Sequence, residues 1–340
     1  MGKIMLLDCT LRDGGYVNNW NFGKNAILDI ERKLVSTGVD IVEIGFLKKE
    51  PYDPNRTVFS AEEQIHPVIA PKKKGVLYAA MVEVQNPLPV AELSPKSESS
   101  VDIIRIIVWK RLLKEGFEYC KAIADKGYKI CIQPARVNQY SEEEFIQMIE
   151  LFNQISPLAV YVVDSWGTQN KEDIVKYASI ANKHLKDDIA LGFHGHNNMQ
   201  QAFSCAEAVI DLNLDRDIII DASIFGIGRG AGNLNIELFA NYLNAKHNKK
   251  YDIKPMLEIY ADYINEIYAR YPWGYTIPHF LTAVVDCNPE YAFYYGAENK
   301  LPANQILDIL LTLSVDDKVI FSKETAERYL EKYSRGTSAS

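Results

Sequence analysis

Short runs of apolar residues recur at regular intervals along about the first two thirds of the chain. They are rich in isoleucine and valine, and they are continuous rather than alternating with polar residues. This pattern is typical of parallel strands that are buried on both faces. The runs begin near Lys3, Asp40, Gly75, Asp102, Tyr128, Leu158, Ile189 and Asp217. We therefore expect eight strands, one from each run.

Helical periodicity fills most of the intervals between these runs. Ser141 and Glu144 form the sequence signature of a capping box, so a helix is expected to begin there. The residues that follow have the i, i+3, i+4, i+7 spacing of an amphipathic helix, which places Phe145, Met148, Ile149 and Phe152 on one face. Two later intervals repeat this spacing, with the sets Ile174, Tyr177, Ala178, Ala181 and Ala202, Cys205, Ala206, Val209.

Strands alternating with helices over about 245 residues predict a (β/α)8 TIM barrel of the α/β class, although a doubly wound sheet uses similar units. The remainder differs in character, because tyrosines from Tyr251 onward are spread among helical patterns. We therefore divide the chain into a barrel catalytic domain at 1–245, a helical C-terminal extension at 246–335 and a disordered tail at 336–340.

Composition and charge narrow the class of protein. The chain has 45 acidic and 37 basic residues, a net charge of −8, which disfavours nucleic acid because phosphate binding needs a basic face. The apolar runs are far shorter than the roughly 18 residues of a membrane span, and no signal-peptide pattern precedes Asp8. The five cysteines form no C-x-x-C pair, so a reducing compartment is expected. These features predict a soluble, cytoplasmic protein with neither nucleic acid nor a membrane as partner.

In a (β/α)8 barrel, reactive side chains lie at the carboxyl ends of the strands. Polar residues at those predicted strand ends are therefore the first candidates for a functional site. In this sequence they include Arg12, Asp13, Glu43, Asp164, Ser165, His194 and His196.

His194 and His196 form the sharpest local motif. Residues i and i+2 of a strand face the same side, about 6.6 Å apart, so two imidazoles can converge on one ion. An isolated H-x-H is more often structural, but Asp13 is expected to reach the same barrel mouth from the first strand. A mixed histidine and carboxylate set, with an asparagine as a further member, suits a borderline-to-hard divalent ion with open water positions. Manganese, magnesium, cobalt and catalytic zinc all stay open.

A glycine-rich segment, GIGRGAGN at 226–233, follows the last predicted strand. It matches the G-x-G-x-x-A dinucleotide fingerprint. That fingerprint belongs at the first strand of a βαβ unit and is followed by an acidic residue about 20 positions on, and neither holds here. A tight loop that lets Asn233 or backbone amides approach a ligand fits the segment better.

Together these segments resemble the DRE-TIM metallolyases, the superfamily of hydroxymethylglutaryl-CoA lyase-like and pyruvate carboxyltransferase domains. Within it, the nearest likeness is to the 4-hydroxy-2-oxovalerate aldolases. The matching segments occur in the order of the family and cover the predicted barrel. They are LLDCTLRDGG at 6–15, IVEIGF at 41–46, VVDSWG at 162–167, LGFHGHNN at 191–198 and DASIFGIGRGAGNLNIE at 221–237.

The resemblance implies a divalent-metal-dependent aldolase that cleaves or forms a 4-hydroxy-2-oxo acid, with a pyruvate enolate as intermediate. It implies that Asp13, His194 and His196 are metal ligands and Asn233 a further one. Mn²⁺ is the first expectation, with Mg²⁺, Co²⁺ and Zn²⁺ open. Arg12 would contact the keto oxygen or enolate, although a salt bridge to Glu43 or Asp164 is an alternative, and both can hold. The substrate-binding candidates are Arg12, Glu43, Asp164, Ser165 and Tyr275.

The chain departs from these aldolases at Tyr16, where they carry a histidine shortly after R-D-G. Tyrosine, with an ordinary pKa near 10, is a poorer base at neutral pH. We therefore expect Tyr16 to position or protonate the substrate as a catalytic residue, or a base to come from elsewhere. Tyr275 and His279, in the segment WGYTIPH, are candidates from the extension, with buried structural roles equally open.

Two alternative functions stay open. One is a Claisen-type acyl-CoA condensing enzyme of the same superfamily; the other, prompted by Tyr16, is a non-catalytic metal- or ligand-binding barrel. The loop at 226–233 lacks the cysteine of the hydroxymethylglutaryl-CoA lyase type, and the chain has no biotinyl A-M-K-M segment. As partners we expect a small 2-oxo acid, a second copy of the chain in a homodimer, and an acylating aldehyde dehydrogenase, with which similar aldolases often work.

Overall fold

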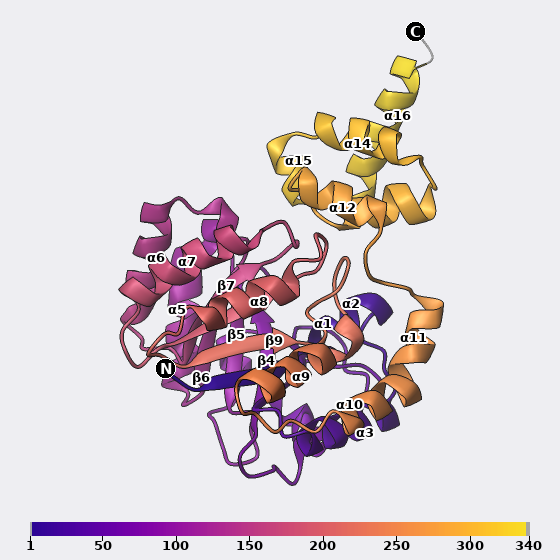
Figure 1. The fold of residues 1–340 in the computed structure, drawn as a ribbon. Coiled ribbons are helices and arrows are strands. Elements are labelled where there is room, and N and C mark those ends of the chain that lie inside the picture. Colours follow the sequence, from indigo (N-terminus) through magenta and orange to yellow (C-terminus); the bar gives the residue numbers. More distant parts are fainter. Residues whose placement is uncertain (1, 338–340) are drawn as a thin grey trace.

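The computed structural model describes residues 2–337, and its centre is a closed ring of eight parallel strands (Figure 1). The ring runs β1-β2-β4-β5-β6-β7-β8-β9, and it closes where Leu7 of β1 pairs with Ile41 of β2. This closure confirms the predicted (β/α)8 barrel and excludes the doubly wound sheet. The strands are β1 Ile4–Asp8, β2 Ile41–Leu47, β4 Leu77–Glu83, β5 Ile103–Val108, β6 Lys129–Pro134, β7 Ala159–Asp164, β8 Ala190–Gly195 and β9 Ile218–Ala222; β3, Val58–Phe59, adds to β2 outside the ring.

Helices connect the strands and cover the outside of the barrel. The capping box predicted at Ser141 is present: Glu144 N donates to Ser141 Oγ at 3.2 Å, and Ser141 N donates to Glu144 Oε2 at 2.7 Å. The α-helices of the barrel are α1 Thr10–Asp13, α2 Gly15–Asn18, α3 Lys24–Ser36, α4 His66–Ile69, α5 Leu113–Asp125, α6 Glu142–Asn153, α7 Lys171–His184, α8 Ala202–Asp211 and α9 Ile236–Lys246. Short 3-10 turns are η1 Glu62–Gln64, η2 Val90–Glu92, η3 Lys110–Leu112, η4 Val137–Gln139 and η5 Ile224–Gly226.

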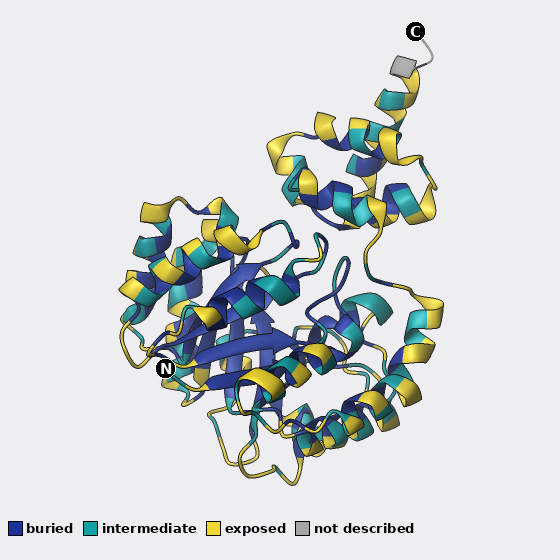
Figure 2. Cartoon of the chain, in the orientation of Figure 1, coloured by how far each residue is buried: buried dark blue, intermediate teal, exposed yellow. Residues whose placement is uncertain are grey.

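The hydrophobic core has two layers that the strands separate. The strands of the barrel are almost entirely buried (Figure 2). Outward-facing residues of the strands pack against the helices, whereas inward-facing residues such as Leu7, Ile103 and Tyr161 fill the barrel. The continuous apolar runs of the sequence follow from this arrangement, because both faces of each strand are buried. Charged side chains also lie inside the barrel, and Glu43 and Arg105 are among the fully buried residues.

The C-terminal extension consists of two parts. Its first helices, α10 Lys254–Ile259, the π-helix η6 Tyr260–Ile264 and α11 Asn265–Arg270, lie against α3 and the barrel. The later helices form a separate cluster with its own apolar core, joined to the barrel by one connecting segment (Figure 1). They are α12 Ile277–Val284, α13 Glu290–Ala292, the π-helix η7 Phe293–Glu298, α14 Ala303–Thr312, α15 Val315–Val319 and α16 Lys323–Thr337. We call this cluster, residues 277–337, the C-terminal cap.

The cap contacts the barrel at the carboxyl end of the strands. Arg136, just after β6, pairs with Asp286 at 2.7 Å between Nη2 and Oδ2. Arg229, after β9, donates from Nη2 to Asn288 Oδ1 at 3.1 Å. The segment 286–290 of the cap therefore lies over the mouth of the barrel. Residues 338–340, part of the tail expected to be disordered, lie outside the described residues, and α16 continues to Thr337.

Among the described residues, no helix has the length and apolar character needed to cross a membrane.

Candidate metal centre

A pocket with about 570 Å³ of empty volume, part of it open to solvent, lies at the carboxyl ends of the strands. This is the place where barrel enzymes carry their reactive groups. Acidic, basic and aromatic side chains line the pocket together. They are Arg12, Asp13, Tyr16, Met81, Glu83, Ile107, Trp109, Gln133, Ala135, Val163, Ser165, Trp166, His194, His196 and Arg229.

The turn after β1 carries two of these residues into the mouth. Asp8, the last residue of β1, accepts hydrogen bonds from Thr10 N at 2.9 Å and Thr10 Oγ1 at 2.8 Å. These bonds turn the chain at once into the short helix α1, which holds Arg12 and Asp13. Trp20 Nε1 donates to the carbonyl of Arg12 at 2.7 Å, which fixes the end of this turn.

Asp13, His194 and His196 form a buried group whose ligand atoms all lie within 4.8 Å of one another. Asp13 Oδ2 is 3.2 Å from His196 Nε2 and 3.7 Å from His194 Nε2. The two histidines come from β8 and the residue just beyond it, at i and i+2, so their side chains point to the same side. The sequence-predicted convergence of these three residues is therefore present in the fold.

Several buried atoms around this group have no hydrogen-bond partner in the described structure. They include Asp13 Oδ2, His196 Nε2 and Asn233 Oδ1. Buried polar atoms without partners are rare, because each costs about 1–3 kcal/mol. A carboxylate oxygen, an imidazole nitrogen and an amide oxygen are all ligands that divalent ions accept. The residues present therefore fit a divalent metal.

The other ring nitrogen of each histidine is held by the barrel. His194 Nδ1 lies 3.0 Å from Asp221 Oδ2, and His196 Nδ1 lies 3.1 Å from the carbonyl oxygen of Asp164. Burial opposes ionisation of Asp221, but Arg105 and His194 bring the pKa of its carboxyl below the usual value. Burial lowers the pKa of His194, which favours the neutral ring. Both acceptors favour an N–H at Nδ1, and in a neutral ring this leaves the lone pair on Nε2, on the side of Asp13.

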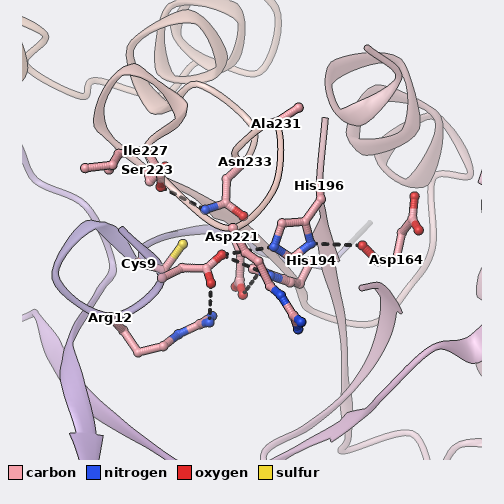
Figure 3. A network of polar contacts seen from close by, with 12 residues as sticks. Cys9, Arg12, Asp164, His194, His196, Asp221, Ser223, Ile227, Ala231 and Asn233 are labelled. Atoms are coloured by element: carbon pink, nitrogen blue, oxygen red, sulfur yellow. Dashed lines mark hydrogen bonds and ion pairs between the residues drawn. The ribbon is translucent and has the colours of Figure 1, made fainter. Parts of the chain in front are cut away.

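Asn233 reaches the same place from the glycine-rich loop (Figure 3). Its Nδ2 donates to the carbonyl of Ile227 at 3.0 Å, which leaves Oδ1 as the uncommitted atom. A Cβ at Gly228 would lie 2.1 Å from Asn233 Nδ2 and 3.2 Å from Asp13 Oδ2. Glycine is therefore required at 228 for the loop to approach the metal-ligand candidates closely.

Arg12 is held by carboxylates on two sides. Its Nε lies 2.7 Å from Glu43 Oε2, and its Nη1 lies 2.8 Å from Asp13 Oδ1. Burial opposes ionisation of Asp13, but the adjacent guanidinium of Arg12 holds the pKa of its carboxyl well below the usual range. Of the two salt bridges considered for Arg12, the one to Glu43 forms. Glu43 lies beneath Arg12 and is not among the residues that line the pocket.

A chain of ion pairs continues from Glu43 through the barrel interior. Arg105 Nη1 donates to Glu43 Oε2 at 2.7 Å, and Arg105 Nη2 pairs with Asp221 Oδ2, which also meets His194. Arg105 is not among the site residues predicted from the sequence. The signal was present as a single arginine within the apolar run IIRIIV, at an inward-facing position.

Tyr16 lines the pocket next to the metal-ligand candidates. Its ring makes edge contacts with Trp20 and Phe46, at centroid distances of 4.9 and 6.2 Å, and the guanidinium carbon of Arg229 lies 5.5 Å from its centroid. Burial raises the pKa of Tyr16 to about 12. Its hydroxyl is therefore a hydrogen-bond donor at neutral pH and not a base.

The remaining predicted residues lie at different distances from the pocket. Ser165 lines it, and its Oγ accepts from Arg136 N at 2.9 Å. Asp164 is buried behind the histidines, where its carboxylate accepts from the backbone of Thr168 and Gln169. Tyr275 is 48% exposed in the segment that leads to the cap and does not line the pocket. His279 lies in α12, with its Nδ1 3.0 Å from Thr276 Oγ1.

Other pocket residues had no predicted role. Glu83 and Trp109 lie at the ends of β4 and β5, where Trp109 Nε1 donates to Glu83 Oε1 at 2.7 Å. Gln133, the second-last residue of β6, is a polar residue at a predicted strand end to which no role was assigned, and it has a buried Nε2 without a partner. Arg229 belongs to the glycine-rich loop, beyond the end of β9. Extending the list of polar strand-end residues to the apolar runs near Gly75 and Asp102 would have included Glu83 and Trp109.

The family model described as HMGL-like matches residues 3–262 of the chain. The chain is 25% identical over 248 residues to a 4-hydroxy-2-oxovalerate aldolase of Shewanella halifaxensis, an alignment that covers 71% of this chain and 70% of the relative. It is 25% identical over 235 residues to an oxaloacetate decarboxylase of Mycobacterium tuberculosis, covering 68% of each chain. Among solved structures, the HMG-CoA lyase from Brucella melitensis superposes with a TM-score of 0.61 at 13% identity, covering 76% of this chain and 96% of that one, and this likeness concerns the fold alone.

Proposed function

Because this chain belongs to the HMGL-like family, we propose that it is a divalent-metal-dependent aldolase. In this proposal it cleaves or forms a 4-hydroxy-2-oxo acid through a pyruvate enolate, as a carbon–carbon lyase. The observation that carries the proposal is the buried group of Asp13, His194 and His196, whose free ligand atoms face a pocket that also contains Arg12. One relative is named 4-hydroxy-2-oxovalerate aldolase, which agrees with this chemistry.

The proposed metal ligands are Asp13, His194 and His196, with Asn233 Oδ1 as a further ligand. We propose Mn²⁺ as the ion, because mixed histidine and carboxylate oxygen ligands suit a borderline-to-hard cation. A divalent ion at this place supplies Lewis acidity for the negative charge that develops when the bond between C3 and C4 breaks.

Arg12 is the proposed residue for stabilising the enolate oxygen. Its guanidinium is fixed by Glu43 and Asp13, and it faces the pocket beside the metal-ligand candidates. A planar, permanently charged group with a fixed direction can aim its remaining N–H donors at a developing oxyanion. Because Glu43 and Asp13 already hold the side chain, little reorganisation is needed when that charge forms.

Tyr16 is proposed as a donor toward the substrate. Since burial raises its pKa to about 12, its hydroxyl stays protonated and can donate to the 4-hydroxyl oxygen, or to the aldehyde oxygen in the reverse direction. Another base must then accept the proton of the 4-hydroxyl. Water at the open mouth of the pocket is one such base. Ser165 lines the pocket. Glu43 and Asp164 are buried behind it, where Glu43 pairs with Arg12 and the carbonyl oxygen of Asp164 lies beside His196.

A second candidate is decarboxylation of a 2-oxo diacid. One relative is named oxaloacetate decarboxylase, and Tyr16 is the residue that favours this candidate. Loss of CO₂ from the carbon next to the keto group leaves the same enolate, which then takes up one proton to give the 2-oxo monoacid. That reaction needs no base at a 4-hydroxyl, and a protonated tyrosine can serve as a donor.

The test is release of pyruvate, measured by coupling to lactate dehydrogenase. We expect chelator-treated protein to be inactive, and Mn²⁺ to restore cleavage of at least one member of a panel of 4-hydroxy-2-oxo acids. His196→Ala is the matched negative variant, and oxaloacetate is included to detect decarboxylation. If the wild-type protein binds Mn²⁺ and releases pyruvate from no compound in either set, both candidates are wrong.

Further expectations belong to the same proposal. We propose that the catalytic unit ends near residue 245, that two copies form a homodimer, that an acylating aldehyde dehydrogenase takes up the aldehyde product, and that the protein works in the cytoplasm. Sedimentation analysis of the purified chain tests the homodimer directly, because a monomer at micromolar concentration would contradict it.

A further inference from the structure

Two arginines line the pocket at different depths. Arg12 is only 4% exposed and is held between Glu43 and Asp13 beside the metal-ligand candidates. Arg229 is 23% exposed and lies nearer the rim, where its Nη2 donates to Asn288 of the cap. Both line the same pocket, so a molecule that fills it meets two guanidinium groups.

The two arginines differ in how far their charge is neutralised. Arg12 has two carboxylate partners within 2.8 Å. Within the described chain, the only carboxylate oxygen found within 4.0 Å of an Arg229 nitrogen belongs to Glu290, whose Oε1 is 4.0 Å from Nε. The hydrogen-bond partner of Arg229 is an amide oxygen, and its Nε has no partner. Arg229 therefore keeps uncommitted donors and a largely uncompensated charge.

The position of Arg229 is fixed by contacts with the barrel and with the cap. The ring centroid of Tyr16 lies 5.5 Å from its guanidinium carbon, and Asn288 Oδ1 accepts from its Nη2. Gly232 N donates to the carbonyl of Arg229 at 3.0 Å, which closes its loop. An arginine held in this way can bind a carboxylate or phosphate with two parallel hydrogen bonds at little further entropic cost.

The loop places Arg229 beyond the metal-ligand candidates. It follows β9, which lies in the barrel between β8, the source of the two histidines, and β1, the source of Asp13. The preceding residue, Gly228, is close to Asp13 Oδ2. A 2-oxo acid held at Asp13 and Arg12 would therefore extend its far end outward, toward the rim where Arg229 lies.

We propose that Arg229 determines specificity by binding a carboxylate or phosphate group at the end of the substrate remote from the 2-oxo acid. The proposal rests on the proposed aldolase function, and it assigns the aldehyde partner to the anionic aldehydes. Glu83 lines the same pocket from β4, which is three strands from β9 in the ring. Its carboxylate accepts from Trp109 and disfavours an anion on that wall, which leaves Arg229 as the anion site.

The kinetic test compares aldehydes that differ in one charged group. In the aldol direction, pyruvate adds to the aldehyde with no atom lost, and we expect kcat/KM to be at least about 10-fold higher for succinic semialdehyde than for butanal. Phosphoglycolaldehyde and glycolaldehyde form a second pair, which separates a carboxylate preference from a phosphate preference. Arg229→Gln is expected to reduce the anionic-to-neutral ratio about 10- to 100-fold. Arg328→Gln is the control, because Arg328 also lies over a tyrosine ring, 5.3 Å from Tyr329, but does not line the pocket.

A binding test separates this proposal from the aldolase function. Neither 2-oxoheptanedioate nor 2-oxoheptanoate has a 4-hydroxyl group, so neither can be cleaved by this route. We expect Mn²⁺-loaded wild-type protein to bind the diacid at least about 10-fold more tightly in calorimetric titration, and Arg229→Gln to bind both compounds equally. This result would support the anion site even if no aldehyde were turned over.

Two outcomes would overturn the proposal. The first is a wild-type protein that shows no preference for the diacid in binding. The second is an Arg229→Gln variant whose KM for pyruvate rises equally with charged and neutral aldehydes, because Arg229 would then bind the carboxylate of the 2-oxo acid itself.

Discussion

Asp221 Oδ2 lies 3.0 Å from His194 Nδ1, at the innermost point of the candidate metal centre. Because Asp221 is ionised and buried, it accepts a proton-bearing nitrogen and so fixes which nitrogen of His194 carries the lone pair. The tautomer that a metal needs at Nε2 is thus set by a residue that is not itself a metal-ligand candidate. Similar control acts at His196, through the carbonyl oxygen of Asp164.

We predict that Asp221→Asn weakens Mn²⁺ binding about 10- to 100-fold, the usual cost of losing such a supporting contact. The amide can donate to His194 Nδ1 and favour the wrong tautomer, and it pairs less well with Arg105. Calorimetric or electron paramagnetic resonance titration with Mn²⁺ measures the change. The control is Asp217→Asn, on an exposed residue that accepts from Lys3 N at the other end of the barrel. Equal dissociation constants for both variants would contradict the prediction.

We predict that Arg12→Lys lowers kcat for pyruvate release by about 10²- to 10³-fold, the range seen when an oxyanion donor is removed. Lysine keeps the charge but cannot span Glu43 and Asp13 with a rigid planar group. Steady-state kinetics with saturating Mn²⁺ gives kcat, and circular dichroism checks the fold. Arg270→Lys is the matched control, since Arg270 is exposed and, within residues 2–337, forms an ion pair only with Glu266 on its own helix. If Arg12→Lys binds Mn²⁺ with wild-type affinity and its kcat stays within twofold of wild type, the direction of the donors at residue 12 is unimportant.

We predict that Tyr16→Phe lowers kcat by about 10²-fold without changing the shape of its pH profile between pH 6 and 9. Since the pKa of Tyr16 is raised to about 12, the wild-type hydroxyl is protonated throughout this range. The variant loses a donor but no titrating base, and it keeps the ring that lies beside Arg229. Tyr271→Phe, at an exposed tyrosine, is the control. If the wild-type pH profile of kcat falls on the acidic side and this fall is absent in Tyr16→Phe, Tyr16 titrates as a base.

We predict a pH-dependent stability contribution from Asp8. Burial raises the pKa of this carboxyl to about 7, well above its value in the unfolded chain. The folded state therefore binds a proton that the unfolded state has lost, so this contribution to stability falls as pH rises from about 4 to 7 and is constant above that. Asp8→Asn should thus gain stability relative to wild type over this range, by up to about 4 kcal/mol at about 1.4 kcal/mol per pKa unit.

Urea unfolding of wild type and Asp8→Asn at pH 4.5, 6 and 7.5 measures this difference. Asparagine can still accept from Thr10 N, so the turn into α1 is expected to survive. A free-energy difference between the two proteins that does not vary with pH would mean that Asp8 is ionised in the folded state across the whole range.

The barrel itself could be predicted because its strands are buried on both faces. Continuous apolar runs record that burial directly in the sequence, and the capping box at Ser141 records a helix start. The convergence of Asp13 with His194 and His196 followed from one further rule, that strand carboxyl ends meet at a single mouth. Local pattern and general topology were sufficient for these features.

The arrangement of charges inside the barrel could not be predicted in the same way. Glu43 was expected to contact substrate, but it lies under Arg12 because Arg105, far along the chain on β5, meets it across the barrel interior. Such a contact depends on which inward-facing side chains share a layer, and the sequence alone does not specify the register of the ring. Local sequence does not record long-range pairing of this kind.

The division of the extension into two parts was also not predicted. Helical periodicity is visible on both sides of Tyr275, but the docking of one part on α3 and of the other over the mouth depends on contacts such as Arg136 with Asp286. Tyr275 is exposed because it lies in the connection between the two parts. A pattern of tyrosines does not distinguish a connecting segment from a substrate contact.

The ion-pair chain from Arg12 to Asp221 has a consequence for electroneutrality. Arg12 and Arg105 carry two positive charges, whereas Asp13, Glu43 and Asp221 carry three negative ones, so the buried set has one excess negative charge. A divalent cation alone would reverse the sign to one positive charge. A cation together with one monoanionic 2-oxo acid would bring the interior to zero. The barrel is thus charge-balanced for the ternary state, and neither component alone achieves that balance.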